Sequence, residues 1–297
     1  MRAIVLAVVI GFGLVHPLHA QSLVGQVQTV TTARGDTLRA LGARFGVDAA
    51  TIARDNGLSR DAPLPVGVEL RLDNRHIVPS FPLDVTVLVN VPQRMVFAAS
   101  GNGVAAYPIA VGRASWPTPL GRFTIVSKET NPTWDVPESI REEARRAGRS
   151  LPRSVPPGPD NPLGAYWLGL SGGGIGIHGT NAASSVYQAV THGCIRLQAG
   201  NIEELFGLVQ VGTQGELVYQ PMLVVVVGDE VFLEVHRDIY RRGPRDPLAY
   251  VKTKAGELGV TDRVDWDAAA RVIHERAGVA RGIARRPGGS PEDRSGS

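Results

Sequence analysis

The chain of 297 residues contains a single cysteine, Cys194. One cysteine cannot form an internal disulfide, so a small scaffold stapled by disulfides is excluded. The thiol is therefore either buried and inert, or present because its reactivity is used. By residue type alone, a lone cysteine is more often a buried apolar side chain than a nucleophile. The residues around Cys194 have to decide between these two interpretations.

Long apolar runs are scarce. One run spans residues 3–15, follows the basic residue Arg2 and ends shortly before Ala20. This order is typical of a secretory signal peptide cleaved after Ala20, so residues 1–20 are predicted to be removed on export. The next apolar run, at 222–227, is too short to cross a bilayer. We expect an exported, soluble mature protein without a lipid attached near the cleavage site.

The chain also lacks a strong charge of one sign. It has 31 Lys and Arg against 28 Asp and Glu, for a formal net charge of +3. The basic residues are dispersed and no nucleic-acid-binding motif occurs, so nucleic acid is not an expected partner. The 35 glycines and 21 prolines favour strands, turns and loops over a helical bundle. The length suits roughly two or three domains.

Residues 25–73 have the pattern of a small strand–helix–helix–strand module. Residues 27–31 alternate like a strand, and Asp36 or Thr37 is placed to cap a first helix. A second short helix is expected over residues 49–55, followed by a turn and a closing strand.

This module resembles the lysin motif, an α+β unit that binds glycan chains rich in N-acetylglucosamine. The resemblance rests on four stretches: GDTL at 35–38, FGV at 45–47, NGL at 56–58 and GVEL at 67–70. Taken singly, these residues are caps, core positions and turns. The loops that would contact glycan are therefore not identified by them.

From residue 84 onwards, many short β-rich runs alternate with Asn-Gly and proline turns, which are hairpin signals. The pattern predicts a mainly β fold of sandwich or barrel type rather than a doubly wound one. A proline- and charge-rich stretch at 131–164, with a helix near 138–147, is expected to be a functional loop or cover. The expected strands are 84–90, 94–98, 104–111, 121–127, 166–170, 174–177 and 214–219.

Beyond this region, residues 220–280 are expected to form a C-terminal extension. Strands are expected at 222–227 and 231–235, and an amphipathic helix at 265–276. Residues 281–297 are rich in Gly, Pro, Ser and Arg, offer little to bury, and are predicted to be a disordered tail.

Two histidines lie near the cysteine in the sequence. His192 precedes Cys194 by two residues, and His178 ends an apolar strand. An imidazole is suited to activating a thiol near neutral pH. Gly193 lets a carbonyl group approach backbone N–H groups that could stabilise an oxyanion. One cysteine and two histidines make a poor zinc pattern. Residue types alone leave the inert and the reactive thiol both open.

The spelling of this region resembles the signature of the L,D-transpeptidase catalytic domain, with HGT at 178–180 and THGCIR at 191–196. The resemblance implies a β-sandwich catalytic domain over 84–219, with the extension packed on it. The order of domains is similar to the Gram-negative periplasmic subgroup, some members of which attach a Braun-type lipoprotein to peptidoglycan. Further segments agree with the family: 107–113, 118–123, 131–134, 158–164 and 233–236.

The resemblance implies acyl transfer on a peptidoglycan stem tetrapeptide, with no cofactor and no metal. Cys194 would attack the carbonyl at stem position three, D-alanine would leave, and an amine would take the acyl group from the thioester. His178 would be the base, oriented by the backbone carbonyl of Gly179. His192 and Gly193 would shape the nucleophile turn and the oxyanion site.

Arg196 and Thr191 also fit the family pattern. We expect Arg196 to pair with a substrate carboxylate, and a structural salt bridge is the alternative. The thioester must meet an amine in the presence of water, so the acceptor groove should be covered, with residues 131–164 as the expected cover. Aromatic side chains that would line this groove, or alternatively belong to the core, are Trp134, Tyr166 and Trp167.

Three functions follow from these interpretations. The first is a periplasmic L,D-transpeptidase, a class that carbapenems target, with glycan strands and stem tetrapeptides as partners and a lipoprotein or an outer-membrane protein as acceptor. The second is a hydrolase that gives the same acyl group to water. The third is a non-catalytic cell-wall-binding protein, against which the pairing of Cys194 with His178 argues.

Overall fold

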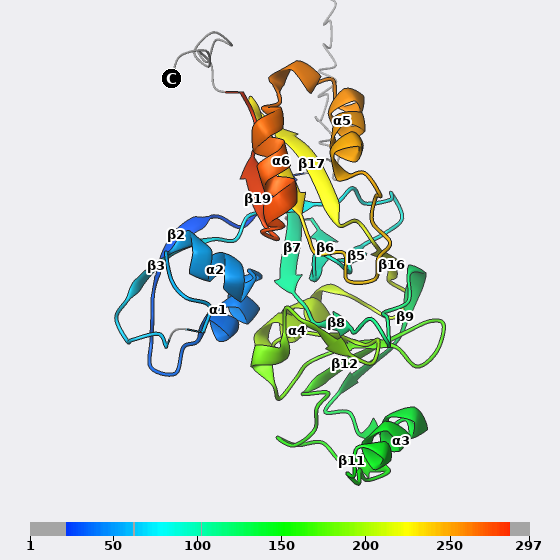
Figure 1. The fold of residues 1–297 in the computed structure, drawn as a ribbon. Helices are drawn as coiled ribbons and strands as arrows, with labels where there is room; N and C mark the ends of the chain where they lie inside the picture. Colours follow the sequence, from blue (N-terminus) through cyan, green and yellow to red (C-terminus); the bar gives the residue numbers. More distant parts are fainter. Residues whose placement is uncertain (1–21, 62, 102, 286–297) are drawn as a thin grey trace, which may run out of the picture.

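The computed structural model describes residues 22–61, 63–101 and 103–285. The predicted signal peptide at 1–20 lies outside these residues. Three units are arranged around a central β-domain. The N-terminal unit lies on one side, the C-terminal unit at one end, and a hairpin segment that carries one helix at the other end (Figure 1). Within the described ranges, no helix is long and apolar enough to cross a membrane.

The N-terminal unit has the predicted strand–helix–helix–strand order. Thr37 caps the first helix, since its hydroxyl accepts a hydrogen bond from the Ala40 N–H at 3.1 Å. Gly46, at φ 73°, ends that helix in the left-handed conformation. The helices pack on a two-stranded sheet around Leu41, Ile52 and other buried side chains. The elements are β2 (Val27–Thr31), α1 (Leu38–Phe45), α2 (Ala49–Asp55) and β3 (Glu69–Asp73).

The central domain is built on one eight-stranded mixed sheet with the order β15-β13-β12-β9-β16-β5-β6-β7. This large curled sheet confirms the predicted mainly β fold. Its strands are β5 (Val87–Asn90), β6 (Met95–Ser100), β7 (Gly103–Pro108), β9 (Gly121–Thr130), β12 (Tyr166–Leu170), β13 (Gly176–His178), β15 (Ile195–Arg196) and β16 (Gln214–Val218).

One face of this sheet is covered by α4 (Ala199–Leu208), a helix that the sequence pattern did not predict. Its Ile202 and Leu205 are fully buried and belong to the same apolar cluster as the inward side chains of the sheet. Beside the sheet, β8 (Val111–Gly112) pairs in parallel with β14 (Ala189–Thr191). A short 3-10 helix, η1 (Ala183–Ser185), precedes β14.

The segment between β9 and β12 forms the hairpin segment at the end of the molecule (Figure 1). β10 (Trp134–Asp135) pairs with β11 (Ser154–Val155), and α3 (Glu138–Arg146) lies between them in sequence, which confirms the predicted helix. The buried amide of Asn161 ties down the base of the segment by donating to the carbonyl of Pro132 at 2.8 Å.

The C-terminal unit is a three-stranded sheet with two helices. Both predicted strands and the predicted amphipathic helix are present, whereas α5 was not expected. Its elements are β17 (Met222–Val227), β18 (Glu230–Val235), α5 (Pro247–Glu257), η2 (Thr261–Arg263), α6 (Trp266–Glu275) and β19 (Ala280–Gly282). Near it, β1 (Ser22–Val24) pairs with β4 (His76–Val78).

The prediction of a disordered tail from residue 281 is wrong for its first residues. β19 pairs with β18, and Ile283 is fully buried. The Arg281 guanidinium forms ion pairs with Asp73 at 2.9 Å and Asp55 at 2.5 Å, both in the N-terminal unit. Strand pairing and these ion pairs therefore order residues whose composition alone offers little to bury. Residues 286–297 lie outside the described part of the chain.

Candidate active site

The register of two neighbouring parallel strands brings the candidate catalytic residues together. β13 and β15 pair so that Ile177 lies beside Ile195 and His178 beside Arg196. Both isoleucines are fully buried in the core of the sheet. Since side chains alternate across a strand, His178 and Arg196 lie on the opposite face of the sheet. Cys194 directly precedes β15, and both the Gly176 backbone and the Arg196 charge act on its thiol.

Trp167 lies on this same face. It is the antiparallel partner of His178, and the two rings stack with their centroids 5.9 Å apart. The indole also lies over Gly176, where an added Cβ would come within 2.3 Å of the ring. Gly176 is thus needed for Trp167 to reach the site. Sequence reasoning missed this glycine, and its only signal was a glycine inside an apolar strand.

The His178 ring is held as a neutral base. Its Nδ1 lies 2.7 Å from the carbonyl oxygen of Gly179, and a carbonyl only accepts, so Nδ1 carries a proton. The backbone of Leu163 is a second contact of the ring. Burial, assisted by the positive charge of Arg196, lowers the pKa of His178 to about 4. The predicted role of Gly179 as the group that orients the imidazole agrees with this geometry.

Cys194 is half-buried, and its Sγ lies 3.9 Å from the carbonyl oxygen of Gly174. Burial raises the pKa of the thiol, and Arg196 offsets this only in part. Burial therefore shifts the two groups in opposite directions, with a raised pKa for the Cys194 thiol and a lowered pKa for the His178 imidazole. The proton has to leave the thiol during the attack on a substrate.

The turn before Cys194 is fixed by two threonines. The Thr191 hydroxyl donates to the carbonyl of Cys194 at 2.6 Å and accepts from the Gly193 N–H at 3.2 Å. The buried Thr118 hydroxyl donates to the carbonyl of Gly193 at 2.9 Å. Both hydroxyls shape the nucleophile turn, so Thr191, predicted to bind substrate, is engaged within the protein. The role of Thr118 was missed.

Gly193 cannot be replaced by a larger residue in this turn. Its φ of 112° is a left-handed conformation that side chains disfavour. An added Cβ would also lie 2.9 Å from Cδ1 of Ile175. The glycine therefore supplies the backbone shape that presents Cys194.

Arg196 has no carboxylate partner within the part of the chain that the structure describes. Its Nη1 donates to Ser185 Oγ at 2.9 Å, and its Nε is buried without a hydrogen-bond partner among the described residues. Burial lowers the pKa of the guanidinium. The alternative role expected for Arg196, a structural salt bridge, is not formed within residues 22–285 as described.

His192 connects the nucleophile turn to the segment predicted as a cover. Its Nε2 lies 2.9 Å from Oε2 of Glu143, a residue of α3, and Glu143 also accepts from Arg113. The Trp116 ring meets the His192 ring edge-on, with centroids 5.1 Å apart. Glu143, Arg113 and Trp116 were missed, because nothing in their sequence positions relates them to His192.

The other two predicted aromatics lie elsewhere. Tyr166 alternates with Trp167 and points to the opposite face, where its ring packs on Phe206 with centroids 4.9 Å apart and its hydroxyl donates to Glu203. Tyr166 is therefore a packing residue for α4, as the alternative interpretation held. Trp134 lies in β10, at the base of the hairpin segment and partly exposed.

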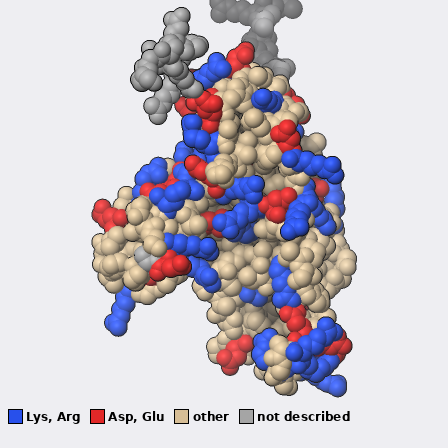
Figure 2. Space-filling model, viewed as in Figure 1, with Lys and Arg blue, Asp and Glu red and all other residues tan. Residues whose placement is uncertain are grey.

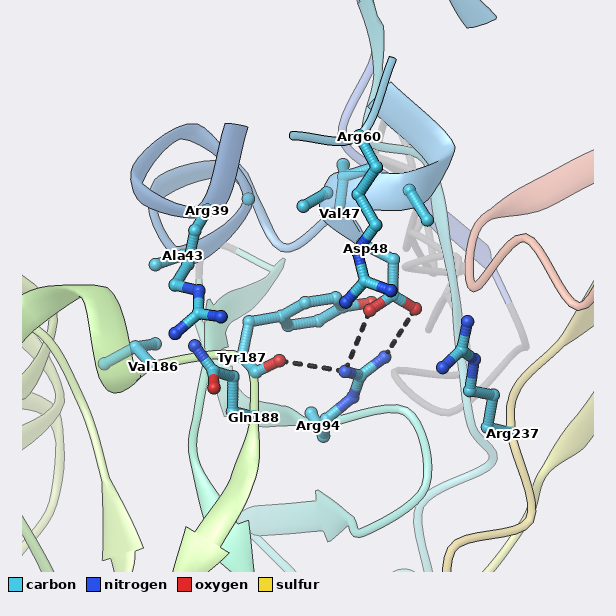
Figure 3. A pocket seen from close by; sticks show the side chains of 13 residues that line it. Arg39, Ala43, Val47, Asp48, Arg60, Arg94, Val186, Tyr187, Gln188 and Arg237 are labelled. Atoms are coloured by element: carbon cyan, nitrogen blue, oxygen red, sulfur yellow. Dashed lines mark hydrogen bonds and ion pairs between the residues drawn. The ribbon is translucent and has the colours of Figure 1, made fainter. Parts of the chain in front are cut away.

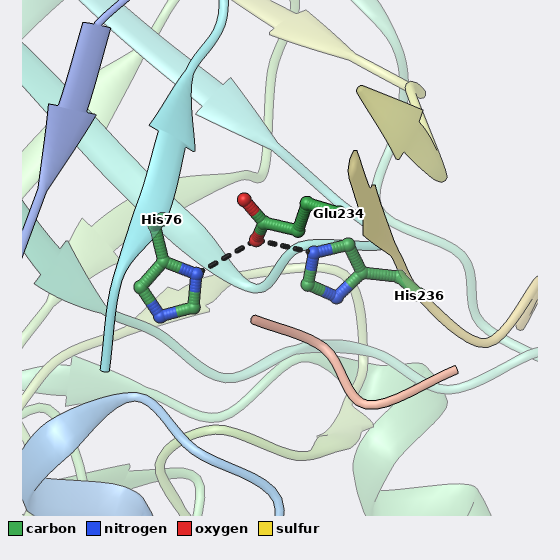
Figure 4. Close-up of side chains that lie close together, drawn as sticks. All are labelled: His76, Glu234 and His236. Atoms are coloured by element: carbon green, nitrogen blue, oxygen red, sulfur yellow. Dashed lines mark hydrogen bonds and ion pairs between the residues drawn. The ribbon is translucent and has the colours of Figure 1, made fainter. Parts of the chain in front are cut away.

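One group of side chains among the described residues is close enough to hold a metal ion. It lies where β4 meets the end of β18 (Figure 4). A single oxygen of Glu234 lies 2.7 Å from Nδ1 of His76 and 2.7 Å from Nε2 of His236. Gln93 and the backbone N–H of Ile77 also donate to this carboxylate. Hydrogen bonding accounts for the geometry of the cluster, which lies apart from Cys194.

Comparison with known proteins identifies the family of this chain. A family model for the L,D-transpeptidase catalytic domain (YkuD) matches residues 84–227, and a LysM domain model matches residues 30–73. The probable L,D-transpeptidase ErfK/SrfK of Escherichia coli is 34% identical over 232 residues, covering 76% of this chain and 74% of the relative. The probable L,D-transpeptidase ErfK/SrfK of Salmonella typhimurium is 32% identical over 288 residues, covering 92% and 91%.

Among solved structures, an L,D-transpeptidase from Mycobacterium smegmatis matches with 19% identity and a TM-score of 0.34, covering 67% of this chain and 99% of the other. Family models and relatives together define an L,D-transpeptidase catalytic domain preceded by a LysM domain. The chain belongs to the L,D-transpeptidase family, which confirms the resemblance found in its motifs.

Proposed function

We propose that this protein is a periplasmic L,D-transpeptidase that transfers peptidoglycan stem peptides through a thioester on Cys194. The observation that carries the proposal is the parallel pairing of β13 and β15, which sets His178 beside Arg196, two residues after Cys194. The signal-like residues 1–20 support export. The LysM domain supports the glycan strand as the surface on which the enzyme works.

In the proposed first half-reaction, the unprotonated Nε2 of His178 takes the proton of the thiol as Sγ bonds to the carbonyl carbon at stem position three. The tetrahedral intermediate then collapses, and His178 returns the proton to the nitrogen of the leaving D-alanine. In the second half-reaction, an acceptor amine attacks the thioester, its proton passes to His178, and Sγ leaves to be reprotonated. No cofactor enters either half-reaction.

The surrounding residues support this sequence. The carbonyl of Gly179 holds the His178 tautomer. The hydroxyls of Thr118 and Thr191 hold the turn that carries the thiol, through the carbonyls of Gly193 and Cys194. Arg196 offers an unpaired cation to a stem carboxylate on the same face. The α3 segment, attached through Glu143 to His192, is proposed as the cover that favours an amine over water at the thioester.

The test is to incubate the mature protein with tetrapeptide muropeptides and an amine acceptor. We expect D-alanine release and an acceptor-linked product mass with wild type, and neither with Cys194→Ala. Product retained by Cys194→Ala would overturn the thioester mechanism. Running the assay in heavy-oxygen water separates transfer from hydrolysis, since hydrolysis incorporates the label. Candidate acceptors to compare are a lipoprotein lysine, an outer-membrane protein terminus, another stem and a free D-amino acid.

A further inference from the structure

A second cavity lies away from Cys194, where the LysM domain meets the catalytic domain (Figure 3). It has a volume of about 120 Å³. One wall is formed by α1 and α2 of the LysM domain, the other by residues 186–188 of the catalytic domain, and Arg237 closes one side. A cavity of this size is smaller than the roughly 150 Å³ that benzene occupies in an engineered protein cavity. It admits a small polar group rather than a sugar ring.

The charge of this cavity is strongly positive. Its lining includes four arginines, Arg39, Arg60, Arg94 and Arg237, and one acidic residue, Asp48. Four guanidinium groups against one carboxylate leave an excess of three positive charges. Figure 2 shows Lys and Arg side chains gathered on the surface where the N-terminal unit meets the body of the molecule.

The carboxylate in the cavity is already used. Asp48 receives two hydrogen bonds from Arg94, at 3.1 and 2.9 Å, and the same guanidinium donates to the carbonyl of Tyr187 at 2.8 Å. Burial raises the pKa of Asp48, but the Arg94 charge outweighs burial and holds that pKa below its ordinary value. Asp48 therefore stays ionised and is paired with Arg94, and is not available to neutralise the other arginines by direct contact.

The remaining three arginines are exposed. Among the described residues, Arg39, Arg60 and Arg237 form no side-chain hydrogen bond or ion pair, although the charge of Arg237 helps to lower the pKa of Asp48. In Figure 3, Arg60 and Arg237 lie on either side of the Asp48–Arg94 pair, and Arg39 lies beside Gln188. Guanidinium groups offer only donors, and their fork geometry matches a carboxylate or a phosphate. The cavity has the chemistry of an oxyanion site.

The catalytic-domain wall of the cavity leads directly to the nucleophile turn. Arg94 holds Tyr187 through its carbonyl and through the face of its ring, 4.1 Å from the guanidinium carbon. Tyr187 has φ 62°, a left-handed conformation that is costly for an aromatic residue and is found where the surroundings enforce it. β14 begins two residues later and ends at Thr191, which holds the turn of Cys194.

We propose that this cavity is a binding site for a small oxyanion, a carboxylate or a phosphate, held by Arg39, Arg60 and Arg237 at the junction of the LysM and catalytic domains. An occupant would touch both domains and the segment that runs into the nucleophile turn. The two sources of this chemistry are a carboxylate of a peptidoglycan stem peptide and free inorganic phosphate. Binding at this site does not depend on the acyl-transfer chemistry proposed above.

The test measures binding without turnover. The full mature chain carrying Cys194→Ala is titrated by calorimetry, in separate arms, with inorganic phosphate, a stem tetrapeptide, and neutral chitotetraose as a probe of the glycan-binding function. Each arm is repeated with Arg39→Gln/Arg237→Gln and with Arg60→Gln. The matched control is Arg34→Gln, an exposed arginine of the same domain that does not line the cavity.

We expect saturable binding of at least one anion, weakened about tenfold or more by Arg39→Gln/Arg237→Gln, as for loss of a charge-assisted contact, and unchanged by Arg34→Gln. Chitotetraose binding should not differ among these variants, and their thermal unfolding should match the parent. Phosphate binding that the cavity variants weaken supports the site with a free anion as occupant. Tetrapeptide binding supports the stem carboxylate only where the cavity variants weaken it, and binding that they leave unchanged belongs to the active site and overturns this occupant. Equal weakening by Arg34→Gln, or no saturable anion binding, overturns the proposal.

Discussion

The molecule contains two buried histidine centres of opposite character. In the candidate active site, His178 is paired with a backbone carbonyl and shares its face with a guanidinium. In the second centre, called the junction below, His76 of β4 and His236, directly after β18, both contact the carboxylate of Glu234 (Figure 4). Burial is nearly complete in both places, so burial alone does not decide what a histidine does.

The partners of each ring make the difference. His76 lies between two groups that only accept, the Glu234 carboxylate at 2.7 Å and the carbonyl of Gly46 at 2.8 Å. Burial raises the pKa of Glu234, but the two histidines outweigh this and lower it to about 2. His178 contacts neutral backbone groups and has a cation nearby, and burial together with that cation lowers its pKa to about 4. A carboxylate is thus the central partner of one centre, and backbone groups with a cation surround the other.

The largest expected effect separates the two centres by activity. His178→Gln removes the proposed base and should lower kcat/KM by roughly 10²- to 10⁴-fold while leaving the unfolding midpoint close to wild type. D-Alanine release from tetrapeptide muropeptides measures the first quantity, and thermal unfolding the second. His274→Gln, an exposed histidine of α6, is the matched control and should behave as wild type. Near-normal turnover by His178→Gln would remove His178 from the mechanism.

The next effect concerns stability. Glu234→Gln removes a fully buried carboxylate that His76 and His236 both contact, and should reduce the free energy of unfolding by about 3–5 kcal/mol. Urea unfolding measures this loss, with Glu230→Gln, exposed on the same strand, as the control. Per folded molecule, D-alanine release should be unchanged. A Glu234→Gln protein as stable as the control would show that the junction does not depend on this ion pair.

The same carboxylate gives this stability a pH dependence. The folded pKa of Glu234 is lowered to about 2 from the ordinary 4.5, so the unfolded chain binds the proton more tightly. Its contribution is fully present above the ordinary pKa and is lost as the pH falls through the folded value. The difference in stability between wild type and Glu234→Gln should therefore shrink on acidification through this range.

The two centres also differ in how far the sequence could reveal them. The active-site histidine and cysteine lie in one short stretch with a recognisable sequence motif. Alternation along the strands then predicts which of the neighbouring side chains share a face of the sheet. The junction joins His76 to Glu234 across 158 positions, and no local pattern relates residues so far apart. The contact of Glu143 with His192, across 49 positions, was invisible for the same reason, although the helix that carries Glu143 was predicted.

Local structure followed a similar rule. The bounds of α2, β12 and β17 were predicted from caps, turns and alternation, because those signals lie within the element itself. α4 was missed because its two glycines obscure a helical pattern that its packing against the sheet stabilises. The residues after 280 were assigned to a tail because their ordering comes from strand pairing and from distant carboxylates.

The smallest expected effect tests whether the active-site cation keeps His178 unprotonated. Burial is the larger cause of the lowered pKa of His178 and Arg196 the second, so the acidic limb of kcat/KM should lie near pH 4 in the wild type. Arg196→Gln removes the neighbouring positive charge, which raises the pKa of His178 and moves this limb to higher pH, by about one unit. Arg196→Lys keeps the charge and should keep the limb in place.

Kinetics over the acidic range separate this role of Arg196 from substrate binding. Loss of a carboxylate contact lowers kcat/KM by the same factor at every pH, whereas a change in the His178 pKa moves the acidic limb of kcat/KM, which reports the free enzyme. An unshifted limb in Arg196→Gln would leave burial as the sole cause of the neutral imidazole. A shifted limb would mean that the Arg196 cation helps to keep His178 neutral. The junction has the opposite arrangement, because there a carboxylate lies beside the histidines.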